Sequence, residues 1–126
     1  MGSFAFGPID PGTKDSLMNS KDNLSAAKAR LGAFAKTSPA LFEGFSKIAK
    51  TATSDGSFSA AQKELIAAAV AVNQGCDDCI LYHVDAAKRQ GADEAALVEA
   101  LAVAVEMGGG PAVMYAGKAL VAYREL

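Results

Sequence analysis

Hydrophobic side chains recur at helical spacing along most of the chain, and they predict a series of α-helices. A first helix is predicted from Asp15 to Lys36, because its apolar residues fall on one helical face: Leu17, Leu24, Ala27, Leu31 and Phe34. Pro39 fits the first turn of a second helix, with Ser38 as its predicted cap. The residues that this second helix is expected to bury are Leu41, Phe42, Phe45, Ile48 and Ala49.

A third helix is predicted after the turn signal Asp55-Gly56, and its start is the clearest in the chain. Ser59 and Gln62 form the pattern of a capping box, in which each side chain satisfies a free backbone N–H. Beyond Glu64 this helix is apolar on nearly every side, so we expect it to be central and buried. Gly75 is expected to end it in the left-handed conformation.

Three further helices complete the predicted fold. One runs from about Asp77 to Gln90, the next is capped by Asp93, and the last follows the break at 108–111, with Pro111 in its first turn. No segment shows the period-two alternation of a strand. The pattern therefore predicts an all-α bundle of about six helices. Residues 1–14 are interpreted as an irregular N-terminal arm, and residues 15–126 as a single helical domain.

Composition and charge narrow the classes of function. The chain has 126 residues and a formal net charge of -2, with no basic stripe that would bind nucleic acid or a membrane surface. Its longest apolar run, Leu65 to Val72, is too short to span a bilayer, and its first residues do not resemble a signal peptide. The expected compartment is the cytoplasm, where a cysteine pair is more often catalytic or metal-binding than a permanent disulfide.

Both cysteines and the only histidine fall between positions 76 and 83. His83 follows Cys79 by four residues and Cys76 by seven, so a helix would place the three on one face. A nearby base can take the proton of a thiol, and the helix N-terminus also favours the thiolate. Asp77 and Asp78 oppose this, because nearby negative charge disfavours the thiolate, and the balance stays open at this point. A thiolate oxidised to sulfenic acid can be attacked by the second thiol, as in a two-cysteine peroxidase or a disulfide reductase.

Glu64, the Cys76-Asp77-Asp78-Cys79 segment and His83 together resemble the motif of the AhpD-like alkylhydroperoxidases. These enzymes belong to the carboxymuconolactone decarboxylase superfamily, and the resemblance extends from about Pro39 to Tyr115. It implies an all-α homo-oligomer, a trimer or hexamer, that reduces hydroperoxides without a cofactor and is itself reduced by a dithiol or a protein partner.

By the same resemblance, each motif residue has an expected role. Cys79 would attack the peroxide and Cys76 would resolve the intermediate. His83, with Glu64 acting through a water-linked relay, would take the proton of Cys79. Asp78 departs from the pattern, since the best-studied members carry histidine there, and this lowers the expected activation of the thiol. The cysteine pair argues against lactone decarboxylation, because the decarboxylases of the superfamily lack it.

Other interpretations of these residues remain open from the sequence. The cysteines could be small buried hydrophobic residues, or they could bind zinc together with His83 and either Glu64 or water. Glu64 alone would be read as a surface acid near a helix start. A non-catalytic oligomeric scaffold is a further alternative. Oligomer formation is predicted independently, because the segments 65–72 and 95–105 are apolar almost all round and a small chain struggles to bury both.

Overall fold

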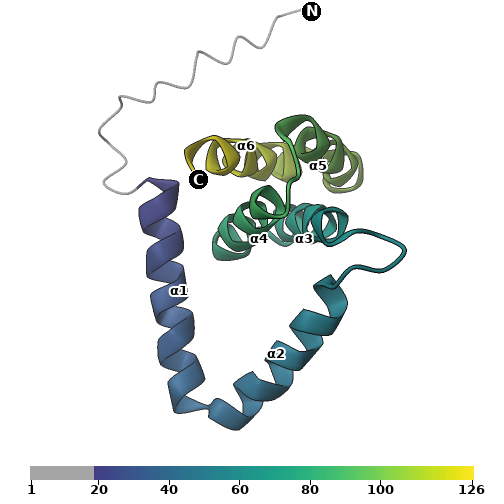
Figure 1. The fold of residues 1–126 in the computed structure, drawn as a ribbon. Coiled ribbons are helices and arrows are strands. Elements are labelled where there is room, and N and C mark those ends of the chain that lie inside the picture. The colour runs from purple at the N-terminus through teal and green to yellow at the C-terminus, as the bar shows by residue number, and fades with distance from the viewer. Residues whose placement is uncertain (1–18) are drawn as a thin grey trace, which may run out of the picture.

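The computed structural model describes residues 19–126, and every regular element in that range is an α-helix (Figure 1). The six helices are α1 (Ser20–Thr37), α2 (Pro39–Thr53), α3 (Ala60–Gln74), α4 (Asp77–Arg89), α5 (Glu94–Gly108) and α6 (Gly110–Glu125). The prediction of an all-α fold with about six helices is confirmed. The predicted start of the first helix at Asp15, its apolar residue Leu17 and the arm of residues 1–14 lie outside the described residues.

Local signals in the sequence account for most helix ends. Both bonds of the capping box join Ser59 and Gln62 at the start of α3, and Gly75 ends that helix with a φ of 66°. Asp93 caps α5 by accepting a hydrogen bond from the backbone N–H of Ala96 at 2.7 Å. A positive φ is the conformation that glycine adopts at least cost, so Gly75 suits its position.

Ser38 departs from the prediction that its side chain caps α2. It occupies the N-cap position, but its hydroxyl makes no capping hydrogen bond. The connection between α1 and α2 is a single residue, so Ser38 also ends α1, where its backbone N–H donates to the carbonyl of Phe34 at 2.9 Å. Its backbone angles, φ −131° and ψ 68°, differ from the extended conformation in which an N-cap side chain reaches the helix.

The core lies among α3, α4, α5 and α6, with α3 in contact with each of the other three. The largest fully buried side chains are Ile80, Leu97, Val72 and Val84. Much of the remaining core is alanine, which lets the helices approach closely: Ala68, Ala71, Ala104, Ala112, Ala119 and Ala122. The prediction that the third helix is a central element is therefore confirmed.

The prediction that α2 buries five apolar residues is wrong for three of them in the single chain, while Phe42 and Ala49 are half-buried. Leu41, Phe45 and Ile48 are 62%, 59% and 67% exposed, and no residue of α2 is fully buried. The reason is the placement of α1 and α2, which form a V that extends away from the four-helix core (Figure 1). The apolar spacing correctly predicts an amphipathic helix, but within residues 19–126 nothing covers its apolar stripe.

The C-terminal end of α6 is tied to α4 and to the start of α5. The ammonium of Lys88 donates to the carbonyls of Tyr123 and Leu126, at 2.8 Å and 2.6 Å. Arg124 pairs with Glu94 at 2.8 Å, and its hydrogen bond lowers the pKa of that exposed carboxyl from its ordinary value. None of the helices α1–α6 has the length and apolar character needed to cross a bilayer.

The close approach of α3 to the end of α5 yields a first testable prediction. A Cβ placed on Gly108 would lie 2.1 Å from Oδ1 of Asn73 and 2.8 Å from Cβ of Ala112. Gly108→Ala is therefore expected to lower the free energy of unfolding in urea by about 1–3 kcal/mol, the usual cost of overpacking. The control is Gly44→Ala in α2, where a Cβ meets nothing within 4 Å. A Gly108→Ala variant as stable as this control would contradict the packing described.

Candidate active site

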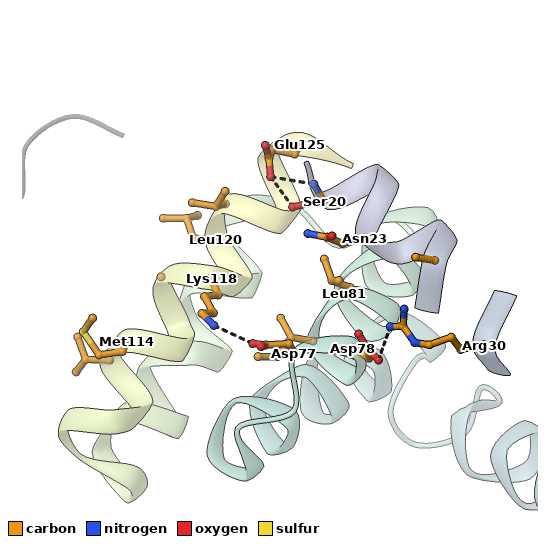
Figure 2. A pocket seen from close by; sticks show the side chains of 15 residues that line it. Ser20, Asn23, Arg30, Asp77, Asp78, Leu81, Met114, Lys118, Leu120 and Glu125 are labelled. Atoms are coloured by element: carbon orange, nitrogen blue, oxygen red, sulfur yellow. Dashed lines mark hydrogen bonds and ion pairs between the residues drawn. The ribbon is translucent and has the colours of Figure 1, made fainter. Parts of the chain in front are cut away.

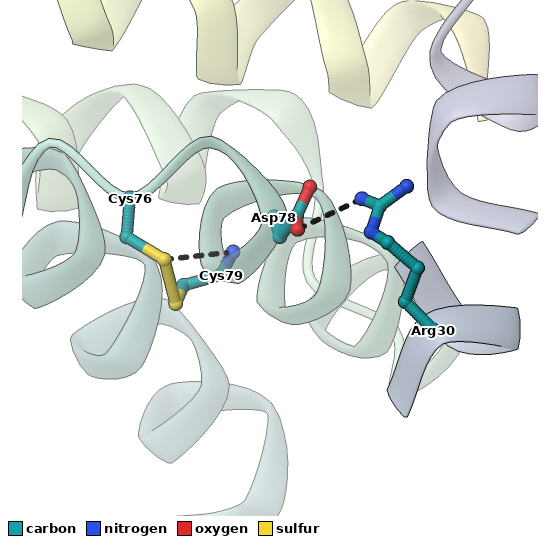
Figure 3. Close-up of a disulfide and its surroundings, with 4 residues drawn as sticks. All are labelled: Arg30, Cys76, Asp78 and Cys79. Atoms are coloured by element: carbon teal, nitrogen blue, oxygen red, sulfur yellow. Dashed lines mark hydrogen bonds and ion pairs between the residues drawn. A yellow bond between two sulfur atoms is a disulfide. The ribbon is translucent and has the colours of Figure 1, made fainter. Parts of the chain in front are cut away.

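The two cysteines form a disulfide at the N-terminal end of α4 (Figure 3). Cys76 is the N-cap residue of that helix and Cys79 lies in its first turn, with 5.2 Å between their Cα atoms. Both residues are half-buried. The predicted closeness of the two thiols is thus realised as a covalent bond between them. The alternative in which both cysteines are unreacting buried hydrophobic residues does not describe this structure.

The backbone of α4 contacts the disulfide directly. The N–H of Cys79 points to the sulfur of Cys76, with 3.3 Å between nitrogen and Sγ. In helices this is the bond that an N-cap side chain makes with the third helical residue. The sulfur of Cys76 therefore occupies the place where a helix stabilises negative charge, through a free N–H and the partial positive charge of its N-terminus.

His83 and Glu64 form a second pair, which joins α4 to α3. Nδ1 of His83 lies 2.7 Å from Oε2 of Glu64, and Glu64 is only 8% exposed. The motif predicted that these two residues act together, whereas the local sequence alone would have placed Glu64 on the surface. Their contact is direct, so no water is needed between the imidazole and the carboxylate.

The His83 ring lies on the same helix as Cys79, one turn further along. Residues four apart on a helix are neighbours, with their Cβ atoms about 5–6 Å apart. Tyr82 packs edge-on against the imidazole, with ring centroids 5.3 Å apart and an interplanar angle of 77°. An ionised Glu64 only accepts hydrogen bonds, so a neutral His83 in this pair carries its hydrogen on Nδ1 and its lone pair on Nε2. Half-buried His83 is therefore oriented as a proton acceptor.

The two acids between the cysteines are each paired with a cation from another helix. Nη2 of Arg30 on α1 lies 3.0 Å from Asp78, and the ammonium of Lys118 on α6 lies 3.1 Å from Asp77. Figure 3 shows the Asp78 carboxylate directed toward Arg30 and away from the disulfide. Sequence analysis missed both cations. The partners are 48 and 41 positions apart, and no local pattern signals such a contact.

A large hollow lies on the other side of α4 from Cys79 and His83. It is a groove of about 1040 Å³ between α1, α4 and α6, and Asp77, Asp78 and Leu81 contribute to its wall (Figure 2). A smaller cleft of about 610 Å³ is lined by Gly75 and Tyr115, beside the start of α4. The volume of this groove therefore does not identify the reactive site. The disulfide and the His83–Glu64 pair lie on the opposite face of the helix.

The zinc alternative receives no support from the arrangement of side chains. Both candidate sulfur ligands are joined to each other, and a thiolate rather than a disulfide is what binds zinc. Across residues 19–126, no group of three or more His, Cys, Asp or Glu side chains is placed to hold a metal ion.

Comparisons with known proteins agree with the motif. Residues 39–122 match the carboxymuconolactone decarboxylase family. An uncharacterized protein of Cupriavidus necator is 47% identical over 84% of this chain and 94% of its own length. Uncharacterized protein 4 in the cox locus of Paracoccus denitrificans is 36% identical over 82% of this chain and 94% of its own.

A solved structure from the same family also has a similar fold. The apo crystal structure of a carboxymuconolactone decarboxylase family protein from Legionella pneumophila superposes with a TM-score of 0.78 at 42% identity, over 82% of this chain and 96% of that one. The match to the family covers α2 through most of α6, the region that carries the disulfide and the His83–Glu64 pair. The chain therefore belongs to the carboxymuconolactone decarboxylase family, and its motif places it among the AhpD-like members.

Proposed function

We propose that this protein is a thiol-dependent peroxidase of the AhpD-like type, which reduces hydroperoxides through Cys79 and Cys76. The observation that carries the proposal is a disulfide at the start of α4, on the helix whose His83 is oriented by buried Glu64. A pair of sulfurs that can exist as a disulfide, beside a positioned base, is the arrangement that two-cysteine redox chemistry requires.

The proposed reaction has two steps on the protein. The Cys79 thiolate attacks the terminal oxygen of ROOH, the O–O bond breaks, and Cys79 becomes a sulfenic acid while RO⁻ takes a proton and leaves as ROH. Cys76 then attacks the Cys79 sulfur, the S–O bond breaks, and water leaves as the disulfide forms. The sum is ROOH and two thiols converted to ROH, water and one disulfide. An external dithiol restores both thiols and leaves as its own disulfide.

His83 serves in the first step as the acceptor of the Cys79 proton. With Nδ1 held by Glu64, Nε2 is the nitrogen left to receive that proton, either directly or through a water molecule. The carboxylate then faces an imidazolium, whose positive charge it stabilises at 2.7 Å. The proton can subsequently pass to the leaving RO⁻, so the same pair would act first as base and then as acid.

The direct test supplies the wild-type protein with a hydroperoxide and dithiothreitol and follows loss of the peroxide. Consumption that is many times the amount of protein, and that stops without the dithiol, is the expected result. If peroxide loss equals the uncatalysed rate while the protein still reduces disulfides of small molecules, the peroxidase proposal is wrong and the chain is a disulfide reductase. If neither substrate reacts, the scaffold alternative stands.

We also propose that the protein works in the cytoplasm as a homo-oligomer, a trimer or a hexamer. The exposed stripe Leu41, Phe45 and Ile48 on α2 supports this, because monomers rarely expose large contiguous apolar surface. Other helices expose apolar residues too, among them Val103, Met107 and Met114 at 64%, 75% and 68%. Light scattering at micromolar concentration is expected to report a mass of at least three chains, and a mass of 12.9 kDa would contradict the proposal.

A further inference from the structure

Two cations from distant helices neutralise the acids that lie between the redox cysteines. Asp77 and Asp78 lie between the two cysteines in the first turn of α4, and each carboxylate is paired with one cation. Arg30 comes from α1 and Lys118 from α6, so the two ion pairs span α4 from both sides (Figure 2). The formal charges of these four side chains cancel.

Lys118 is held in place by a second contact. Its ammonium lies 5.1 Å from the centre of the Tyr115 ring, one turn earlier on α6. That ring in turn packs on the backbone at Gly75, where a Cβ would come within 3.3 Å of it. Tyr115 therefore lies between the cation and the residue that directly precedes Cys76.

Neutralisation matters because reduction of the disulfide can create negative charge on sulfur. An unpaired carboxylate in the first turn would repel a thiolate on either cysteine and would cancel part of the stabilisation from the helix N-terminus. A carboxylate paired with a cation has a much weaker field at the sulfurs. In this structure each ion pair therefore reduces the opposition of its acid to the stabilisation that the helix N-terminus gives a thiolate.

We propose that Arg30 and Lys118 tune the equilibrium between the disulfide and dithiol forms of Cys76 and Cys79. They do so by neutralising the charges of Asp78 and Asp77. The proposal deepens the peroxidase function and rests on it for its biological purpose. The two cations favour the reduced form, which can carry a thiolate. Because they come from α1 and α6, the equilibrium depends on where these two helices lie against α4. Neither residue needs to contact the substrate for this effect.

The test is the equilibrium of the purified full-length protein with reduced and oxidised glutathione at pH 7.5, in low salt. Two glutathione thiols reduce the protein disulfide and leave as oxidised glutathione, so the ratio of protein forms gives the equilibrium constant. One unpaired charge near a partly exposed sulfur shifts such a constant by roughly two- to fivefold. Arg30→Gln is expected to favour the disulfide by about that factor, and Lys118→Gln to act in the same direction.

A double-mutant cycle separates this electrostatic role from a merely structural one. Asp78→Asn leaves Arg30 unpaired and is expected to favour the thiols, the opposite direction to Arg30→Gln. Arg30→Gln combined with Asp78→Asn should return the constant to near its wild-type value. The control is Arg89→Gln, which breaks the Arg89–Asp85 pair of 2.9 Å in the last turns of the same helix and should change nothing.

The outcomes distinguish this inference from the proposed function. If Arg30→Gln matches wild type, or if Asp78→Asn fails to reverse its effect, the inference is overturned, whatever the peroxide assay shows. If the cycle behaves as expected while no peroxide is consumed, the inference holds and the peroxidase function is rejected. Thiolate formation can be checked independently, because the rate of iodoacetamide alkylation of the reduced protein should fall in Arg30→Gln and recover in the double variant.

Discussion

Replacement of Cys79 by serine is expected to abolish peroxide consumption supported by dithiothreitol. The hydroxyl of serine is a far weaker nucleophile than a thiolate and cannot form a sulfenic acid or a disulfide. The turnover rate should fall by at least about a hundredfold. Removal of the catalytic nucleophile from other enzymes lowers the rate by much more than this. The measurement is the initial rate of hydroperoxide loss at fixed concentrations of protein and dithiol.

Cys76→Ser provides the matched comparison, because it alters the other sulfur of the same disulfide. This variant keeps the attacking thiol, so it should react with about one peroxide per chain and then accumulate a sulfenic acid that a dimedone probe labels. Labelling of Cys76 in the Cys79→Ser protein, together with single turnover there, would reverse the two roles. Full activity in both variants would show that the disulfide has no part in the reaction.

The second large effect is expected for Glu64→Gln, which keeps the size and hydrogen-bonding capacity of the side chain but removes its charge. An amide cannot stabilise an imidazolium on His83 as the carboxylate does at 2.7 Å. The rate of peroxide reduction should fall by about 10²-fold or more, within the range that a positioned base contributes. Single-turnover kinetics at pH 7 measure this step without interference from the recycling dithiol.

Two comparisons decide whether the pair acts as a unit. Glu43→Gln removes an exposed carboxylate of α2, which pairs with Lys47 at 3.7 Å, and it should leave the rate unchanged. His83→Gln should lose about as much activity as Glu64→Gln, and the double variant little more, since residues acting together are not additive. A Glu64→Gln protein with normal rates would leave Glu64 with a structural role only.

Much of the fold was predictable because its signals are local. The capping box at Ser59, the left-handed glycine at Gly75 and the cap at Asp93 each act within a few residues, and the structure places a helix end at every one. The candidate site was predictable for a similar reason. The spacing of Cys76, Cys79 and His83 acts through one helix, and a spacing of four residues fixes neighbours on a helical face.

The remaining features depend on contacts between distant parts of the chain. The apolar stripe of α2 is real, but its spacing cannot reveal that the helix leaves the core and exposes Phe45 and Ile48. The burial of Glu64 follows from the packing of α3 on α4, and its local sequence argues for the surface. The cations on Asp77 and Asp78 come from helices at either end of the described chain, where no spacing rule could indicate them.

The central claim is that peroxide and the Cys76–Cys79 pair exchange two electrons with one-to-one stoichiometry. Fully reduced protein mixed with an equal amount of an organic hydroperoxide, then quenched in acid and analysed by mass spectrometry, tests this without any recycling partner. The account predicts one intramolecular disulfide and one molecule of alcohol for each peroxide consumed, with no reaction in Cys79→Ser. Intact peroxide beside two free thiols, or alcohol formed without the disulfide, would contradict it.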